Sequence, residues 1–150
     1  MKNRLLRIAI QGGFAIALVW GVGSGASLAI AAMSPAQKTI YDSYATAAKS
    51  ADAAFTDFSA SRGAAFFQGK HAGGKPDTAS CTACHTPDPK KIGRTRAGKD
   101  IQPMAASANP KRFTDAADVE KWFRRNCIDV LGRECTVLEK GDVLAYLLGI

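Results

Sequence analysis

The stretch "CTACH", residues 81–85, decides the fold of this chain. Two cysteines three positions apart can form thioethers to one edge of a porphyrin, and the histidine that follows can turn its imidazole toward the iron. Cys81 and Cys84 are therefore predicted to hold one haem c covalently, with His85 as the proximal iron ligand. A thioredoxin-like redox pair would need a βαβ context, and no segment here alternates with period two over a useful length.

Two further uses of the cysteines are less favoured. The chain has four cysteines, and a zinc site would need a second close pair, but Cys127 and Cys135 are eight residues apart. A disulfide between Cys81 and Cys84 would be strained, because only two residues separate them. Haem attachment remains the interpretation that this pattern favours.

Residues 1–31 are predicted to be a signal peptide. Lys2, Arg4 and Arg7 precede an apolar run, and the small-residue stretch that follows places Ala29 and Ala31 in the −3 and −1 relation that a signal peptidase reads. The apolar run is short and glycine-rich for an uncleaved membrane anchor. We therefore expect cleavage, no membrane anchor in the mature protein, and export to the oxidising periplasm, where cysteines can be modified.

Residues 32–150 are predicted to form one monohaem domain of 119 residues. Removing the signal peptide takes away three basic and no acidic residues, so the net charge falls from +7 to +4. This mild excess suits docking to an acidic partner, and the absence of a dense Lys/Arg run with aromatics argues against nucleic acid. A domain of this size buries only about two-thirds of its unfolded surface, so a cofactor in the core would stabilise it.

The hydrophobic periodicity predicts an all-α fold with long loops. Ser34 before Pro35 is typical of a helix start, and Thr136 with Glu139 forms a predicted capping box. Helices are expected from Pro35 to about Ser50, over 52–67, from Thr114 through Trp122 and Phe123, and from Thr136 through Leu148. The stretches 69–78 and most of 86–110 are rich in glycine and proline and are expected to be irregular.

The second axial ligand of the iron has three candidates. Methionine is common in electron-transfer cytochromes, and Met104 is the methionine available beyond the mature N-terminus. It lies within the segment 101–105, which we expect to accept a hydrogen bond from Nδ1 of His85. His71 would require its glycine-rich loop to wrap the haem. Asn126, expected at the end of the Trp122-Phe123 helix, is either a distal ligand or a helix C-cap.

Four segments resemble the sphaeroides haem protein family of small periplasmic oxygen-binding cytochromes c of the class I type. They are "GGKPDTASCTACH", "GKDIQPMAASANPKRFTD", "VEKWFRRNCIDVLGRECT" and "EKGDVLAYL". The resemblance implies a class I cytochrome c-like helical fold wrapped around one haem. It also implies that Asn126 is the distal ligand and that Cys127 and Cys135 form a disulfide. Met104 stays open as the alternative ligand.

Three functions follow as hypotheses. The first is a protein that accepts electrons, from a dihaem cytochrome c if the resemblance holds, and binds O₂, NO or CO at ferrous iron once a weak distal ligand is released. The second is a simple electron-transfer cytochrome c with a methionine ligand. The third is a small O₂ or nitrogen-oxide reductase. No general acid stands near Asn126 in the sequence except Asp129 and Glu134, which are expected to be solvated, so we expect no enzyme.

Overall fold

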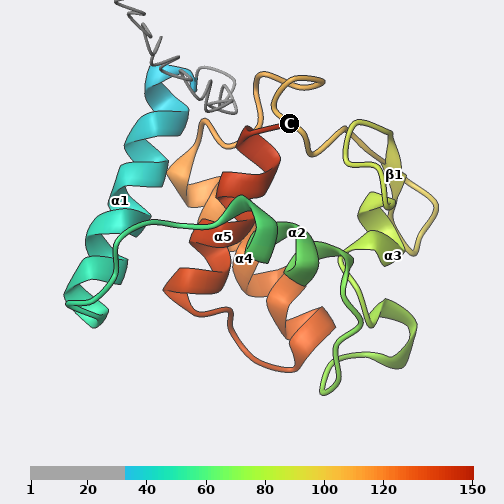
Figure 1. Cartoon of the computed structure of the whole chain (residues 1–150). Coiled ribbons are helices and arrows are strands. Elements are labelled where there is room, and N and C mark those ends of the chain that lie inside the picture. The colour runs from blue at the N-terminus through green and yellow to red at the C-terminus, as the bar shows by residue number, and fades with distance from the viewer. Residues whose placement is uncertain (1–32) are drawn as a thin grey trace, which may run out of the picture.

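The computed structural model describes residues 33–150, so the predicted signal peptide lies outside the described residues. Within them the fold is all-α, as predicted, with long irregular connections (Figure 1). The helices are α1 (Pro35–Ala51), α2 (Ala60–Gln68), α3 (Thr82–His85), α4 (Ala116–Leu131) and α5 (Val137–Leu148), with one 3-10 turn, η1 (Pro76–Thr78). Strands β1 (Gly93–Arg94) and β2 (Asp100–Ile101) form a short antiparallel pair inside the long loop that was expected to be irregular.

The helix ends follow their local capping residues. Ser34 and Gln37 form a capping box at α1, and Thr136 and Glu139 form the predicted capping box at α5. Helix α4 begins at Ala116, two residues later than expected, because Asp115 is its N-cap and the side chain of Asp115 accepts a hydrogen bond from the backbone N–H of Asp118. These caps satisfy backbone donors that the helices leave unpaired.

The expected helix over 52–67 is wrong in its first half, because α2 begins only at Ala60. Asp52 instead forms a local turn, in which its Oδ1 accepts from Ala54 N at 2.8 Å. Further along, Ser59 N donates to the buried carboxylate of Asp142 at 2.7 Å and the Ser59 side chain caps α2. The tertiary contact with α5 therefore fixes where this helix starts.

Two clusters of apolar side chains form the core, and α5 contributes to both. The helix cluster joins α1, α4 and α5 with the segment before α2; its buried members are Ile40, Tyr44, Ala48, Phe58, Val119, Leu144 and Leu148. The motif cluster has Phe67, Val143 and Leu147 at its centre, and the half-buried Phe66, Cys81, Met104, Phe113, Phe123, Tyr146 and Ile150 pack against it. The predicted haem-binding segment thus lies against the second cluster.

A very close approach of backbones sets the crossing of α2 and α5. A Cβ atom at Gly63 would lie only 1.9 Å from the carbonyl oxygen of Asp142, so this position in α2 requires glycine. At the same crossing, Arg62 donates to the two carboxylate oxygens of Asp142 at 2.7 and 2.8 Å. This crossing places Phe67, at the other end of α2, in the motif cluster.

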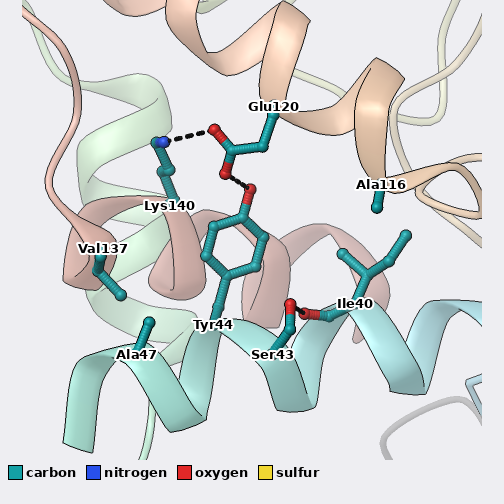
Figure 2. A pocket seen from close by; sticks show the side chains of 8 residues that line it. All are labelled: Ile40, Ser43, Tyr44, Ala47, Ala116, Glu120, Val137 and Lys140. Carbon is teal, nitrogen blue, oxygen red and sulfur yellow. Dashed lines mark hydrogen bonds and ion pairs between the residues drawn. The ribbon is translucent and has the colours of Figure 1, made fainter. Parts of the chain in front are cut away.

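A polar contact at the helix cluster joins α1, α4 and α5 through Tyr44, Glu120 and Lys140 (Figure 2). The Tyr44 hydroxyl and the Lys140 ammonium both donate to the carboxylate of Glu120, the latter at 2.8 Å. They border an open cavity of about 220 Å³ that none of the predicted site residues lines. None of the helices within residues 33–150 is long and apolar enough to cross a membrane.

Candidate functional site

The residues of the Cys-x-x-Cys-His motif share one short helical turn, α3. The backbone N–H groups of Cys84 and His85 donate to the carbonyl of Cys81 at 3.3 and 3.0 Å, so all three side chains leave the same turn. Thr86 ends the helix with a positive φ of 62°. Both cysteines are half-buried free thiols, and burial raises the pKa of Cys81 to about 11. Two unpaired thiols beside one imidazole fit covalent haem attachment.

His85 is a buried and neutral imidazole, as expected of an iron ligand. Its Nδ1 atom is buried and has no hydrogen-bond partner within residues 33–150. Burial first, and the positive charge of Arg112 second, lower the pKa of His85 to about 4, which keeps the imidazole neutral and its lone pair free. Its ring lies 6.2 Å from that of Phe67, centroid to centroid. A buried polar atom without a partner is rare in folded proteins, so the protein alone leaves this imidazole unsatisfied.

The segment 101–105 does not accept a hydrogen bond from Nδ1 of His85, so that expectation is wrong. Arg112 occupies its carbonyls instead, donating to Pro103 O at 2.9 Å and to Gln102 O at 2.6 Å. Arg112 is half-buried, and burial lowers its pKa. It forms no ion pair with a carboxylate in the described part of the chain. The positive charge of Arg112 is therefore not neutralised by a carboxylate of the described residues, and it can attract an anionic group beside His85.

Asn126 lies in the interior of α4, five residues before Leu131, and not at a helix end. The C-cap role therefore belongs to Gly132, whose left-handed φ of 70° ends the helix. Asn126 is half-buried on the same side of α4 as Phe123, one turn earlier, which packs against the motif cluster. Its carboxamide makes no hydrogen bond to any residue that the structure describes. Such a group is free to bind a ligand or a metal.

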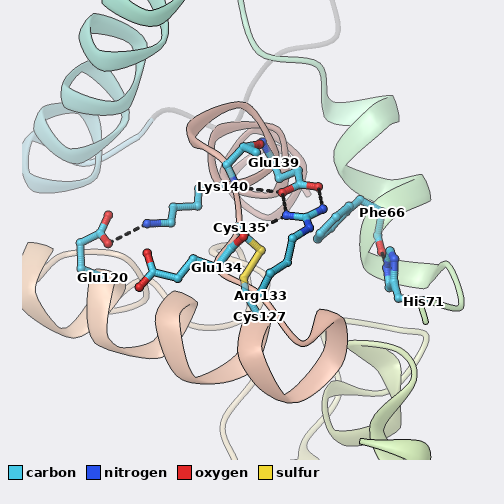
Figure 3. The surroundings of a disulfide bond; sticks show 10 residues. Phe66, His71, Glu120, Cys127, Arg133, Glu134, Cys135, Glu139 and Lys140 are labelled. Atoms are coloured by element: carbon cyan, nitrogen blue, oxygen red, sulfur yellow. Dashed lines mark hydrogen bonds and ion pairs between the residues drawn. A yellow bond between two sulfur atoms is a disulfide. The ribbon is translucent and has the colours of Figure 1, made fainter. Parts of the chain in front are cut away.

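Cys127 and Cys135 are bonded in the structure, with their sulfur atoms 1.96 Å and their Cα atoms 5.6 Å apart (Figure 3). Both residues are buried. Cys127 directly follows Asn126 on α4, and Cys135 directly precedes Thr136, the N-cap of α5. The bridge therefore ties the turn of α4 that carries Asn126 to the start of α5, and Asn126 is held on a helix and not on a loop.

The other two candidate ligands are placed differently. Met104 is half-buried and packs against the motif cluster, as Cys81 does, while its backbone N–H donates to Pro89 O at 2.8 Å. His71 stacks on Phe66 with ring centroids 4.7 Å apart, and its Nε2 lies 2.8 Å from the Phe66 carbonyl. A carbonyl can only accept, so this nitrogen carries a proton and is not free for iron.

Asp129 and Glu134 form ion pairs at the surface. Asp129 pairs with Lys75 at 2.5 Å and Glu134 with Arg124 at 3.7 Å, and the two carboxylate side chains are 40% and 63% exposed.

The sequence did not predict a role for Arg112. No local pattern marks a lone basic residue in a loop whose partners are backbone carbonyls.

Comparisons with known proteins show which family this chain resembles. A family model described as a domain of unknown function, DUF1924, matches residues 53–147. The cytochrome c-type protein SHP of Cereibacter sphaeroides is 58% identical over 88 residues, which cover 59% of this chain and 68% of that protein. Cytochrome c'' of Methylophilus methylotrophus is 38% identical over 121 residues, covering 80% of this chain and 83% of that protein. The chain belongs to this family of c-type cytochromes.

A solved structure of a family member supports the same assignment. Oxidised SHP, described as an oxygen-binding cytochrome c, superposes with a TM-score of 0.66 at 49% identity, covering 77% of this chain and 96% of SHP. The SHP and cytochrome c'' family carries covalently bound haem c, which is therefore the cofactor of this chain. The unpaired thiols of α3 and the partnerless Nδ1 of His85 fit that cofactor.

Proposed function

We propose that this family member is a periplasmic monohaem cytochrome that accepts electrons and binds a diatomic molecule, O₂, NO or CO, at ferrous iron, with Asn126 as a weak distal ligand that gives way. The observation that carries the proposal is the half-buried carboxamide of Asn126, which has no hydrogen-bond partner in the described residues and stands on a tethered helix. No residue in the described part of the chain competes for this carboxamide, so it is available to a ligand.

The residues that would hold the haem surround the motif cluster. Cys81 and Cys84 would form the two thioethers, and His85 would be the proximal ligand. Arg112, beside His85 and without a carboxylate partner in residues 33–150, offers positive charge to the acidic groups of the haem. Phe67, only 2% exposed, gives the site an apolar wall that excludes water. When bound, the haem would supply a redox-active iron that can take up a small ligand.

The chemistry of the side chain explains why Asn126 suits this role. A carboxamide oxygen is a hard and weak ligand, which favours ferric iron and holds the softer ferrous iron less well. Once displaced, the same side chain still carries an NH₂ group that can donate a hydrogen bond to a small molecule nearby. The bond between Cys127 and Cys135 limits how far the turn that carries Asn126 can withdraw.

The electrons would come from a redox partner protein, and a dihaem cytochrome c is the partner that the family resemblance suggests. The same proposal places the mature protein in the periplasm, as residues 32–150 after cleavage of the signal peptide. Its mild positive charge suits an acidic partner surface. No enzymatic activity is part of the proposal, since Asp129 and Glu134 are engaged in surface ion pairs.

A second candidate function is a simple electron carrier with Met104 as the sixth ligand. Met104 packs against the same cluster as Cys81, and this favours the second function, because methionine is a common sixth ligand in electron-transfer cytochromes. In that case the iron would be six-coordinate in both oxidation states and would not bind an external ligand quickly.

Optical spectra of the ferric and ferrous holoprotein, with and without CO, test the proposal. We expect a ferrous form that is five-coordinate and high-spin and that binds CO quickly. Asn126→Ala should keep the haem content but change the ferric spin state, whereas the matched variant Met104→Leu should leave both spectra unchanged. A ferrous form that stays low-spin and ignores CO, together with a large effect of Met104→Leu, would reject the proposal in favour of the electron carrier.

A further inference from the structure

The loop of residues 73–78 lies directly against the C-terminal end of α4. Cβ atoms at Gly74 and Gly132 would lie 2.3 Å from the carbonyl oxygen of Asp129 and 2.1 Å from that of Gly73 respectively. Gly73 and Gly132 both have positive φ angles, 97° and 70°. Backbone therefore packs on backbone without side chains between them, which only glycine permits at these positions. We call this loop the latch loop.

The latch loop donates hydrogen bonds to the carbonyl of Asp129, which has no partner within α4. Asp129 O accepts from Lys75 N at 2.7 Å and from the hydroxyl of Thr78 at 3.0 Å. Thr78 is only 4% exposed, so this hydroxyl bond is shielded from water. The side chains of Lys75 and Asp129 add an ion pair at the surface. The last four carbonyls of a helix need such partners, and here one comes from a buried side chain far away in the sequence.

The disulfide holds the same turn of α4 from another element. Cys127 is bonded to Cys135 ahead of α5, as Figure 3 shows, while the latch loop holds Asp129 two residues further along. Asn126 directly precedes this doubly anchored stretch. Only two residues, Ala79 and Ser80, separate Thr78 at the end of the latch loop from Cys81. The segment that would carry the covalent haem and the helix that carries Asn126 are thus joined by the Thr78 contact.

We propose that Thr78 is a positioning residue that fixes the place of Asn126 relative to the haem attachment segment. This inference rests on the proposed role of Asn126 as the distal ligand. Without the hydroxyl, Asp129 O keeps only the Lys75 N–H, and the end of α4 is held to the latch loop by one buried hydrogen bond fewer. Asn126 then reaches the ferric iron less often. A hydrogen bond of this kind shifts an equilibrium by about 2- to 10-fold.

The test is a double-mutant cycle on the ferric holoprotein, read as the ratio of high-spin to low-spin haem by electron paramagnetic resonance. Thr78→Val removes the hydroxyl at nearly constant volume and should raise this ratio about 2- to 10-fold. Thr78→Ser keeps the hydroxyl and should restore the wild-type ratio. In an Asn126→Ala background Thr78→Val should have no further effect. Thr46→Val is the matched control, because that hydroxyl also donates to a backbone carbonyl, Asp42 O at 2.9 Å, but on α1.

The outcomes separate this inference from the proposed function. If Asn126→Ala changes the ferric spectrum but Thr78→Val does not, the positioning role is rejected and the distal role of Asn126 stands. An unchanged spectrum in Asn126→Ala rejects the distal role, and the inference with it. An effect of Thr78→Val that persists in the Asn126→Ala background means that Thr78 acts by another route, which also overturns the inference. If Thr78→Val does not fold, Thr78→Ala carries the same comparison.

Discussion

Replacing Gly63 by alanine has two opposite effects on stability, a gain in helix propensity and a loss from a backbone clash. Helix propensity alone favours alanine over glycine by about 1 kcal/mol within a helix. In this fold, however, the new Cβ would lie 1.9 Å from Asp142 O, whereas an ordinary contact begins near 3.4 Å. The neighbouring atoms belong to the backbone of α5 and cannot rotate away. The two helices would therefore have to separate by roughly 1.5 Å along this direction.

The cost of the backbone clash should exceed the gain in helix propensity. Overpacking a tight core contact costs about 1–3 kcal/mol, and a backbone neighbour places this site near the upper end. After the propensity gain of about 1 kcal/mol, Gly63→Ala should lower the free energy of unfolding by about 2 kcal/mol. The separation would also shift Phe67, on the same helix, away from its contacts with His85 and Tyr146.

Guanidinium chloride unfolding of the ferric holoprotein, followed by far-UV circular dichroism, measures this change. The matched control is Ala65→Gly, an exposed position two residues along the same helix. There glycine should be the worse residue, by about 1 kcal/mol. The sign of the preference for glycine should thus reverse between positions 63 and 65. A Gly63→Ala protein that is as stable as the wild type would refute the backbone contact between α2 and α5.

Two other perturbations have outcomes that the structure determines. The double substitution Cys127→Ser with Cys135→Ser opens a loop with a sequence separation of 8 and should lower the free energy of unfolding by about 2.5 kcal/mol in the chain-entropy model; an unchanged denaturation midpoint would contradict it. Burial acts to raise the pKa of Glu120, but hydrogen bonds from Lys140 and Tyr44 outweigh it and lower that pKa in the folded protein. The contribution of this carboxylate is therefore complete above its unfolded pKa, near 4.5, and is lost as the pH falls through the lower folded value. Glu120→Gln should flatten the acid limb of stability measured between pH 5 and pH 2, and an unaltered acid limb would count against the network.

The parts of the fold that short-range chemistry controls were predictable. Ser34 with Pro35, and Thr136 with Glu139, mark helix starts because the capping atoms lie within three residues of each other. The start of α2 was not predictable, since it depends on the hydrogen bond from Ser59 N to the carboxylate of Asp142, which lies 83 residues away on α5. Periodicity over a short window cannot register a contact of that separation.

The same division applies to the candidate site. The spacing of Cys81, Cys84 and His85 is local, so it pointed to haem directly, and the structure keeps the three on one turn. Asparagine at 126 suggested a helix end, but Gly132 supplies the left-handed residue that ends α4. The surroundings of His85 depend on tertiary structure, because Arg112, whose charge acts on His85, is held by the carbonyls of Gln102 and Pro103.

The division of the core into two clusters has a consequence for how the protein matures. The helix cluster contains no residue of the haem motif, so α1, α4 and α5 can assemble in the apoprotein before the cofactor arrives. Helix α3 contacts β1 and η1 and lies at the side of the molecule in Figure 1. Haem would then be attached at the edge of a partly folded scaffold. In this order of assembly, loading would close the motif cluster as the final step.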